Sequence, residues 1–275
     1  AQTDEGSLVL RGDTAGPELA KVQSLMGTFE GSKIAYIGTY ADDKKGVFIN
    51  ESGGVKYKNI RSFYATEDTQ IPFYIGQDTK VVEEKDVPYE KVVLNTKASV
   101  EVDKVRTLLS RTKDGIVWLA SLGESSAVGI NTDIDKSYDS IARINLSSKD
   151  VLWYDGVKTD LKHRVIETKH SRGYNHLTSP VFSSISKDVL YSGRVETVST
   201  LEDGVSTFKD YVSNNNEDVA NYSHSPADAK AANVLASGKG LPQIKIARSN
   251  DSFYYVASQD AQKFVGLNSE KWGPF

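Results

Sequence analysis

Six short segments of this chain share one pattern: an apolar residue, any residue, a Tyr or Trp, one further residue, and then a small or polar residue. The aromatic residues of the pattern are Tyr36, Tyr74, Trp118, Trp153, Tyr191 and Tyr255. Successive aromatics lie 35 to 44 residues apart over the first five segments and 64 apart at the last. A recurrence of about 40–50 residues is typical of β-propeller blades, although strands favour Tyr and Trp in any case. The pattern predicts strands at these six places and leaves open whether they form a true repeat.

Three further segments have features of helices. Residues 17–27 begin with a proline and end with a glycine, as helices often do. Apolar side chains recur at helical spacing in residues 99–111. Residues 225–240 begin with Ser-Pro and are rich in alanine. The first two segments precede strands of the aromatic pattern, an order typical of mixed folds. We therefore expect an α+β fold, mainly β with a few short helices. The alternative is a six-bladed β-propeller-like repeat.

Most of the remaining chain is expected to form strands, because Tyr, Val, Ile and Phe are concentrated there. We expect one mainly β globular domain over residues 17–262, with a subdivision near 160–180 as an alternative. Residues 1–16 are expected to form an extended N-terminal arm and residues 263–275 a C-terminal tail. The expected strands are 33–40, 46–49, 56–64, 71–76, 90–94, 115–121, 151–155, 189–198, 243–248 and 253–258.

Some segments resemble two known protein families. AYIGTYADDKKGVFI, which begins at Ala35, resembles the first hairpin of lactonase-type β-propeller proteins. The end of the chain, AQKFVGLNSEKWGPF, resembles a stretch of bacteriophage contractile-tail sheath proteins, where it lies near the start of the chain. SKDVLWYDGVKTD and GLPQIKIARSNDSFYYVAS are similar to core strands of the same sheath family. The second resemblance implies a structural role in a virion, and no functional residue is carried over from either family.

Composition argues against several classes of function. The chain has 33 basic and 37 acidic residues, a net charge of −4, and no basic stripe, so we expect no nucleic-acid specificity. No apolar run approaches the roughly 20 residues that cross a bilayer, so we expect no membrane span. The absence of cysteine excludes disulfides, thiolate catalysis and cysteine-bound metals.

The polar segments do not match catalytic or metal motifs. His163, His170 and His176 are 7 and 6 residues apart, a spacing that does not place two imidazoles on one face, and we expect a polar loop. Residues 131–139 start like a calcium loop but lack its glycine and its closing glutamate. Ser125 lacks the flanking glycines of a nucleophile elbow. We therefore expect no catalytic residue, no cofactor and no metal.

The two ends of the chain carry apolar residues that polar termini usually lack. Leu8, Val9 and Leu10 form a short apolar run in the arm, and Trp272 and Phe275 lie in the tail. We expect these residues to contact copies of the same chain or other subunits of an assembly, because buried aromatics dominate interface energies. The chain begins with Ala rather than Met, and we expect that a leader or propeptide was removed.

The leading hypothesis is a non-enzymatic structural subunit of a larger assembly. On the sheath resemblance, we expect a phage virion or tail component, located in the virion or outside the cell. The alternative is an exported β-propeller that binds or hydrolyses a small molecule or glycan. In either case we expect Trp118 and Trp153 to be core residues rather than ligand contacts, since both lie inside apolar strands.

Overall fold

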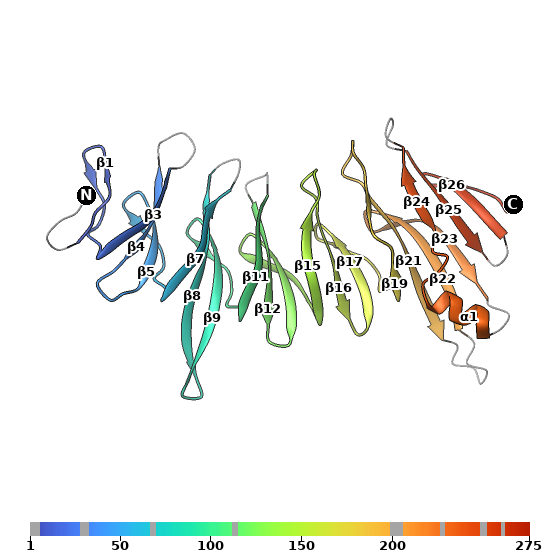
Figure 1. The fold of residues 1–275 in the computed structure, drawn as a ribbon, viewed down its shortest axis with the longest axis horizontal. Helices are drawn as coiled ribbons and strands as arrows, with labels where there is room; N and C mark the ends of the chain where they lie inside the picture. The colour runs from blue at the N-terminus through green and yellow to red at the C-terminus, as the bar shows by residue number, and fades with distance from the viewer. Residues whose placement is uncertain are drawn as a thin grey trace. The chain divides into compact units, whose positions relative to one another are not determined.

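The computed structural model describes residues 6–27, 33–66, 70–111, 115–198, 206–225, 229–247, 252–259 and 262–275. Almost all regular structure in these residues is β (Figure 1), which confirms the expectation of a mainly β protein. The chain divides into two compact units, residues 1–137 and 138–275. No helix in the described residues is long and apolar enough to span a membrane.

Unit 1 holds three four-stranded antiparallel sheets in its described residues, each made of strands that are consecutive in the chain. A small hairpin, β1 (Leu10–Arg11) and β2 (Thr14–Ala15), precedes them. Sheet I is β3 (Lys21–Gly27), β4 (Ile34–Thr39), β5 (Lys45–Ile49) and β6 (Ser52–Gly53). Sheet II is β7 (Asn59–Ala65), β8 (Pro72–Val82), β9 (Lys85–Leu94) and β10 (Lys97–Ala98). Sheet III is β11 (Lys104–Arg111), β12 (Gly115–Leu122), β13 (Ser125–Ile130) and β14 (Asp133–Tyr138).

Unit 2 continues the same plan. Sheet IV is β15 (Ser140–Leu146), β16 (Leu152–Lys158), β17 (Leu161–Ile166) and β18 (Lys169–His170). Sheet V is β19 (His176–Leu177), β20 (Val181–Phe182), β21 (Val189–Val198), β22 (Ser206–Asn214) and β23 (Glu217–His224), with β19 and β20 both paired to β21. Sheet VI is β24 (Gln243–Ile246), β25 (Phe253–Gln259), β26 (Gln262–Leu267) and β27 (Glu270–Trp272). A helix, α1 (Ala229–Ala236), lies between β23 and β24.

Each segment of the aromatic pattern supplies one strand per sheet, and this strand is the second in the hydrogen-bonded order of the sheet. Each of these strands carries a buried aromatic residue, called the anchor below. In sheet IV the anchor is Tyr154, not Trp153, because neighbouring residues of a strand point to opposite faces. The expectation of a core residue therefore holds for Trp118, which is fully buried, whereas Trp153 is half-buried and lines a cavity. The anchors are Tyr36, Tyr74, Trp118, Tyr154, Tyr191 and Tyr255.

Within each unit, consecutive sheets pack through apolar faces. In sheets II, III, V and VI the anchor faces the preceding sheet of the same unit. In sheet II the residue after the anchor, Ile75, faces the following sheet. Sheet II is buried on both faces within unit 1, which explains why β8 begins with five consecutive buried residues, 72–76, instead of an alternating pattern. The core clusters between sheets I and II and between sheets V and VI are Ile37, Val47, Tyr57, Ile60, Tyr74 and Val93, and Leu190, Val212, Tyr222, Phe253, Tyr255, Ala257 and Phe264.

The small residue two positions after the anchor is required by a side chain that lies against it. A Cβ atom at Gly76 would lie 2.5 Å from the ring of Tyr57, and one at Gly156 would lie 2.5 Å from the ring of Tyr138. Tyr57 comes two residues before the first strand of sheet II, and Tyr138 comes two residues before the first strand of sheet IV. The recurring small residue is therefore part of the repeat and not an accident of composition.

Two of the three expected helices are strands. Residues 21–27 of the expected helix 17–27 form β3, and residues 104–111 of the expected helix 99–111 form β11. Both strands contain a bulge, between Gln23 and Met26 and between Val105 and Thr107. A bulge inserts extra residues and shifts the alternation of faces, so the apolar residues recur at intervals that imitate a helix.

The third expected helix is present as α1, which lies inside the range 225–240. Gly238 follows the end of the helix, and its φ of 76° is the left-handed conformation common after helices. Residues 226–228 of the expected range lie outside the described residues. The histidine segment, expected to be a loop, instead carries β17, β18 and β19. These strands are hard to predict from the sequence, because polar residues occupy their exposed positions.

Candidate functional sites

One cross-strand pair recurs at the same place in every sheet, on the face opposite to that of the anchor. It consists of the residue after the anchor and its partner on the next strand, and it is called the forward pair below. In sheets I and II it is apolar and packs into the core shared with the next sheet. In sheet V one member of the pair, Ser192, is polar. Sheets IV and VI depart further from this arrangement, and both mark candidate sites. The forward pairs are Ile37–Val47, Ile75–Val92, Leu119–Val128, Asp155–Arg164, Ser192–Val212 and Val256–Val265.

Sheet IV replaces the apolar forward pair with an ion pair. Arg164 Nε donates to Asp155 Oδ1 and Nη2 donates to Oδ2, both at 2.8 Å. Arg164 Nη1 donates to the carbonyl oxygen of Thr178 at 3.0 Å, and its guanidinium lies 4.7 Å from the ring centroid of Tyr191. The Arg164 side chain is buried, whereas Asp155 is partly exposed. A bidentate pair with a further acceptor satisfies a buried guanidinium, which would otherwise be costly.

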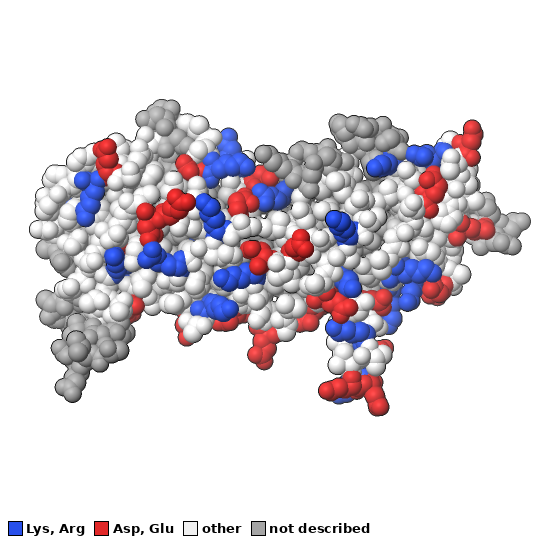
Figure 2. Space-filling model, turned by 180° about the vertical axis from the view of Figure 1, so that it is seen from behind, with Lys and Arg blue, Asp and Glu red and all other residues white. Residues whose placement is uncertain are grey.

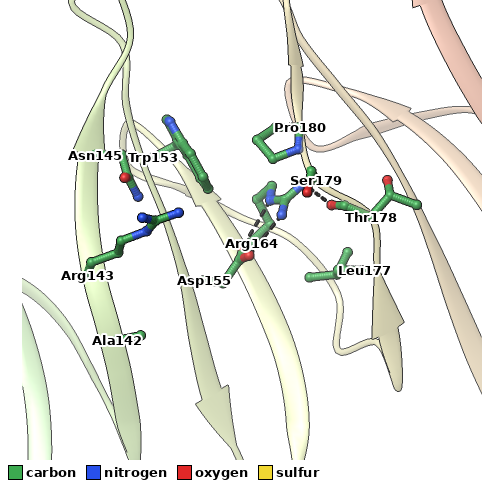
Figure 3. A pocket seen from close by; sticks show the side chains of 10 residues that line it. All are labelled: Ala142, Arg143, Asn145, Trp153, Asp155, Arg164, Leu177, Thr178, Ser179 and Pro180. Carbon is green, nitrogen blue, oxygen red and sulfur yellow. Dashed lines mark hydrogen bonds and ion pairs between the residues drawn. The ribbon is translucent and has the colours of Figure 1, made fainter.

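The exposed side of this ion pair is a cavity of about 210 Å³ (Figure 3). Trp153 forms one wall, and its ring lies 5.7 Å from that of Phe182. Asn145, the cross-strand neighbour of Trp153, and Arg143 come from β15. Figure 3 shows the side chain of Arg143 extending from β15 toward Trp153 and the ion pair. The cavity therefore combines an aromatic surface, an amide and a guanidinium.

A second cavity, of about 620 Å³, shares Leu177, Thr178 and Ser179 with the first. Its other wall is formed by residues after α1, including Gly238 and Pro242. The two cavities are therefore neighbours that share one short segment of the chain.

Sheet V contains a buried charged network near this second cavity. Arg194 is bound by both carboxylate oxygens of Asp210, at 2.5 and 2.7 Å, and donates to the carbonyl oxygens of Leu235 and Lys239 at the end of α1. His224 Nε2 lies 3.1 Å from Asp210 Oδ2. Burial alone would raise the pKa of Asp210, but the hydrogen bonds from Arg194 and His224 outweigh it and lower the pKa. The network fastens the end of the helix to the sheet, which is a structural role.

A similar buried carboxylate lies in sheet II. Glu90 accepts hydrogen bonds from Arg61, Gln77 and the backbone N–H of Val105. Burial would raise the pKa of Glu90, and these donors lower it overall. Because Val105 belongs to the first strand of sheet III, Glu90 links two sheets of unit 1. This too is a structural arrangement.

Sheet VI has an apolar forward pair like sheets I and II, but it is exposed. Val256 and Val265 are 43% and 38% exposed, whereas Ile75 and Val92 are 1% and 0% exposed. The cross-strand neighbours of the pair are also exposed and largely apolar. The exposed apolar residues, called the terminal face below, are Tyr254, Val256, Val265, Leu267 and Trp272.

The five interface residues expected from the sequence fall in two places. Leu8 and Val9 are half-buried, with Val9 packed against the Tyr36 cluster, and Leu10 is exposed on β1. Trp272 and Phe275 are exposed, and the backbone of Phe275 pairs with Lys263 of β26. Residues 263–275, expected to be a tail, thus supply most of β26 and all of β27. Whether these residues contact another subunit stays a prediction.

The described residues contain no group of three His, Asp or Glu side chains arranged to hold a metal ion. His163 and His170 both lie near Tyr138, with His170 Nδ1 at 2.7 Å from the Tyr138 hydroxyl. His176 Nε2 is 2.6 Å from the carbonyl oxygen of Ala236. Charged side chains of both signs are interspersed on the face in Figure 2, without a basic patch that would follow a nucleic-acid backbone.

Comparisons with known proteins place the chain only distantly. No protein-family model matches the sequence, and no curated protein sequence matches it. Among solved structures, the chain is similar to the β-propeller domain of the Trilobed protease from Pyrococcus furiosus, with 15% identity and a TM-score of 0.32 over 92% of this chain and 83% of that chain. A likeness at this level does not bear on activity.

Proposed function

We propose that this protein is a non-enzymatic subunit that assembles through the terminal face of sheet VI. The observation that carries the proposal is the exposure of Val256 and Val265, whose counterparts Ile75 and Val92 are buried under the next sheet. An apolar sheet face of this kind is normally covered, because exposed contiguous apolar patches mark interaction sites. The partner of the terminal face is therefore expected to be another sheet.

The opposite end of the repeat is not available to cover such a face. In sheet I the anchor Tyr36 packs with Phe48 under residues of the N-terminal segment, including Val9 and Leu19. Gly16 of that segment lies against the Tyr36 hydroxyl. A head-to-tail stack of copies would have to displace this segment. We therefore propose that the terminal face binds the terminal face of a second copy.

The terminal face is complementary to itself. One row across the sheet reads Lys245, Tyr254, Leu267 and Glu270, with a basic residue at one edge and an acidic residue at the other. A twofold axis in the interface, parallel to the strands, would bring Lys245 of each copy opposite Glu270 of the other. It would also stack the apolar middle of both rows, as in aligned sheet packing.

The size of the face predicts a weak dimer. Four strands about 4.8 Å apart and up to seven residues of about 3.3 Å each give a face of roughly 20 by 23 Å. That is smaller than the ~800 Å² that each partner contributes to a standard stable interface. We expect an association that depends on protein concentration and is strengthened when further subunits are present.

Sedimentation velocity over a range of protein concentrations tests the proposal. The wild-type chain should show a concentration-dependent dimer, and Val265→Asp should remain a monomer, because a charge would be buried in the interface. Val81→Asp is the matched control, since Val81 is an exposed valine of β8 outside the terminal face. A wild-type chain that stays monomeric at all concentrations would overturn the proposal.

A charge exchange tests the orientation of the two copies. Lys245→Glu alone should weaken association, since it places two acidic residues opposite each other. Adding Glu270→Lys should restore the opposite charges and the association. If the double variant is as weak as the single one, the two faces do not meet with a twofold axis parallel to the strands.

We further propose that the assembly is a phage virion or tail. The resemblance of the chain's end and of two core segments to contractile-tail sheath proteins is what supports a phage virion or tail, and with it a location in the virion or outside the cell. Mass spectrometry of purified particles from the native source tests this part alone. Absence of the chain from particles would remove the virion while leaving self-association untouched.

A further inference from the structure

The cavity beside Asp155 and Arg164 has a floor that is polar but electrically balanced. Three N–H groups of Arg164 are used by Asp155 and by the Thr178 carbonyl. Its charge is therefore neutralised inside the fold and is not free for a ligand. Any net positive charge in the cavity must come from another residue.

Arg143 supplies that charge. It lies in the bulge of β15, between Ile141 and Ile144, is exposed, and makes no hydrogen bond or ion pair with a described residue. The bulge arginine of sheet III, Arg106, instead donates to Ser126 at 2.8 Å. Bulges often re-aim a side chain next to a functional site. Figure 3 shows the Arg143 guanidinium extending toward Trp153 and the ion pair.

Trp153 provides a flat apolar surface opposite this guanidinium. One part of its ring is held by Phe182 and by Arg164, whose guanidinium lies 5.5 Å from the ring centroid. The rest of the ring faces the cavity, together with the amide of Asn145. A rigid aromatic surface, an amide and an unpaired guanidinium suit a ring that carries a carboxylate, which arginine binds through two parallel hydrogen bonds.

We propose that this cavity binds a ring-shaped ligand bearing a carboxylate, such as a hexuronic acid residue of an acidic polysaccharide. The ring would lie on Trp153 and the carboxylate would pair with Arg143. The volume of about 210 Å³ is below the range of sites for drug-sized ligands, about 300–1,000 Å³, so it accommodates one ring. The neighbouring cavity of about 620 Å³ provides room for adjoining residues of a longer ligand.

Titration of the full chain by NMR tests this inference, using the three tryptophan indole N–H signals as probes. Galacturonate should shift the Trp153 signal, identified by its loss in Trp153→Phe, and leave that of the buried Trp118 unchanged. Galactose, which lacks the carboxylate, should bind at least tenfold more weakly. Phenylacetate is a second probe: stronger binding of it than of galacturonate would identify an aromatic acid as the carboxylate-bearing ring.

Two variants separate the cavity from general charge effects. Arg143→Gln should weaken galacturonate binding at least tenfold, whereas Lys158→Gln, which removes a positive charge elsewhere on sheet IV, should leave it unchanged. The inference is overturned if neither acid shifts the Trp153 signal, if galactose binds as well as galacturonate, or if the two variants behave alike. None of these outcomes depends on dimer formation through sheet VI.

Discussion

Sheets II and VI carry nearly the same forward pair in opposite surroundings. Ile75 and Val92 of sheet II are sealed in the core shared with sheet III, whereas Val256 and Val265 of sheet VI are exposed. The local sequence is apolar in both cases, so the difference arises from what lies over the face. An apolar strand pair in this repeat is therefore a preformed contact surface. Its role depends on whether a sheet covers it.

The largest expected effect comes from placing a charge on each of these two faces. Val92→Asp buries an unpaired carboxylate at a cost of several kcal/mol, a large share of the ~5–15 kcal/mol of a typical domain. Val265→Asp should leave the stability of the monomer nearly unchanged. Urea denaturation at low protein concentration measures both. Equal losses of stability would show that sheet VI is covered within the monomer.

Breaking the ion pair of sheet IV is expected to cause the next largest loss of stability. Asp155→Ile leaves Arg164 buried without its carboxylate and should cost about 3 kcal/mol, the low end for a broken buried pair because Asp155 is partly exposed. Asp155→Ile combined with Arg164→Met rebuilds an apolar forward pair like that of sheet II.

The double variant should recover most of the lost stability, because apolar residues of similar volume often replace buried ion pairs without penalty. Denaturation midpoints of wild type, single and double variants form the measurement. A double variant less stable than Asp155→Ile would mean that this position of sheet IV requires charge for folding.

Sequence patterns revealed part of this repeat and concealed the rest. The recurring Tyr or Trp predicts five of the six anchors correctly, but in VLWYD the pattern selects Trp153 instead of Tyr154. Aligning on the small residue two positions after the anchor, as in YIG, YDG and YSG, would have corrected it. That alignment places Asp155 where Ile37 and Ile75 stand, and so signals the unusual sheet.

Other features had no such signal. The bulges of β3 and β11 give these strands an apolar spacing that resembles that of a helix. The sequences of β14 and β23 are so polar that they cannot be told from loops. The partner of a forward pair depends on strand register, which the sequence does not display. The exposure of Val256 and Val265 depends on what covers sheet VI, and no property of the two residues reveals it.

A smaller effect concerns the buried carboxylates of sheets II and V. Because the folded-state pKa of Asp210 lies below its unfolded value, its contribution to stability is present above pH ~4 and is lost as pH falls through the folded pKa. Asp210→Asn should therefore be less stable than wild type at pH 7, with the difference shrinking at lower pH. Glu90→Gln should show the same trend.

Urea unfolding at several pH values between 7 and 3 measures this difference. Glu83→Gln, at an exposed turn residue after β8, is the control and should leave the stability unchanged. If the difference in unfolding free energy between wild type and Asp210→Asn stays constant down to pH 3, the ionised carboxylate of Asp210 does not stabilise the fold.

The smallest effect distinguishes the two faces without introducing charge. Threonine has nearly the shape of valine but carries a hydroxyl in place of one methyl group. Burying a hydroxyl without a hydrogen-bond partner costs about 1–3 kcal/mol. Val92→Thr in sheet II should therefore be measurably destabilised. Val256→Thr should change monomer stability by no more than about 0.5 kcal/mol, since its hydroxyl remains in water. Its effect should instead appear in sedimentation at high concentration, as a shift toward monomer. If Val256→Thr lost as much stability as Val92→Thr in dilute solution, the terminal face would be an ordinary part of the core, and assembly through it would have to be abandoned.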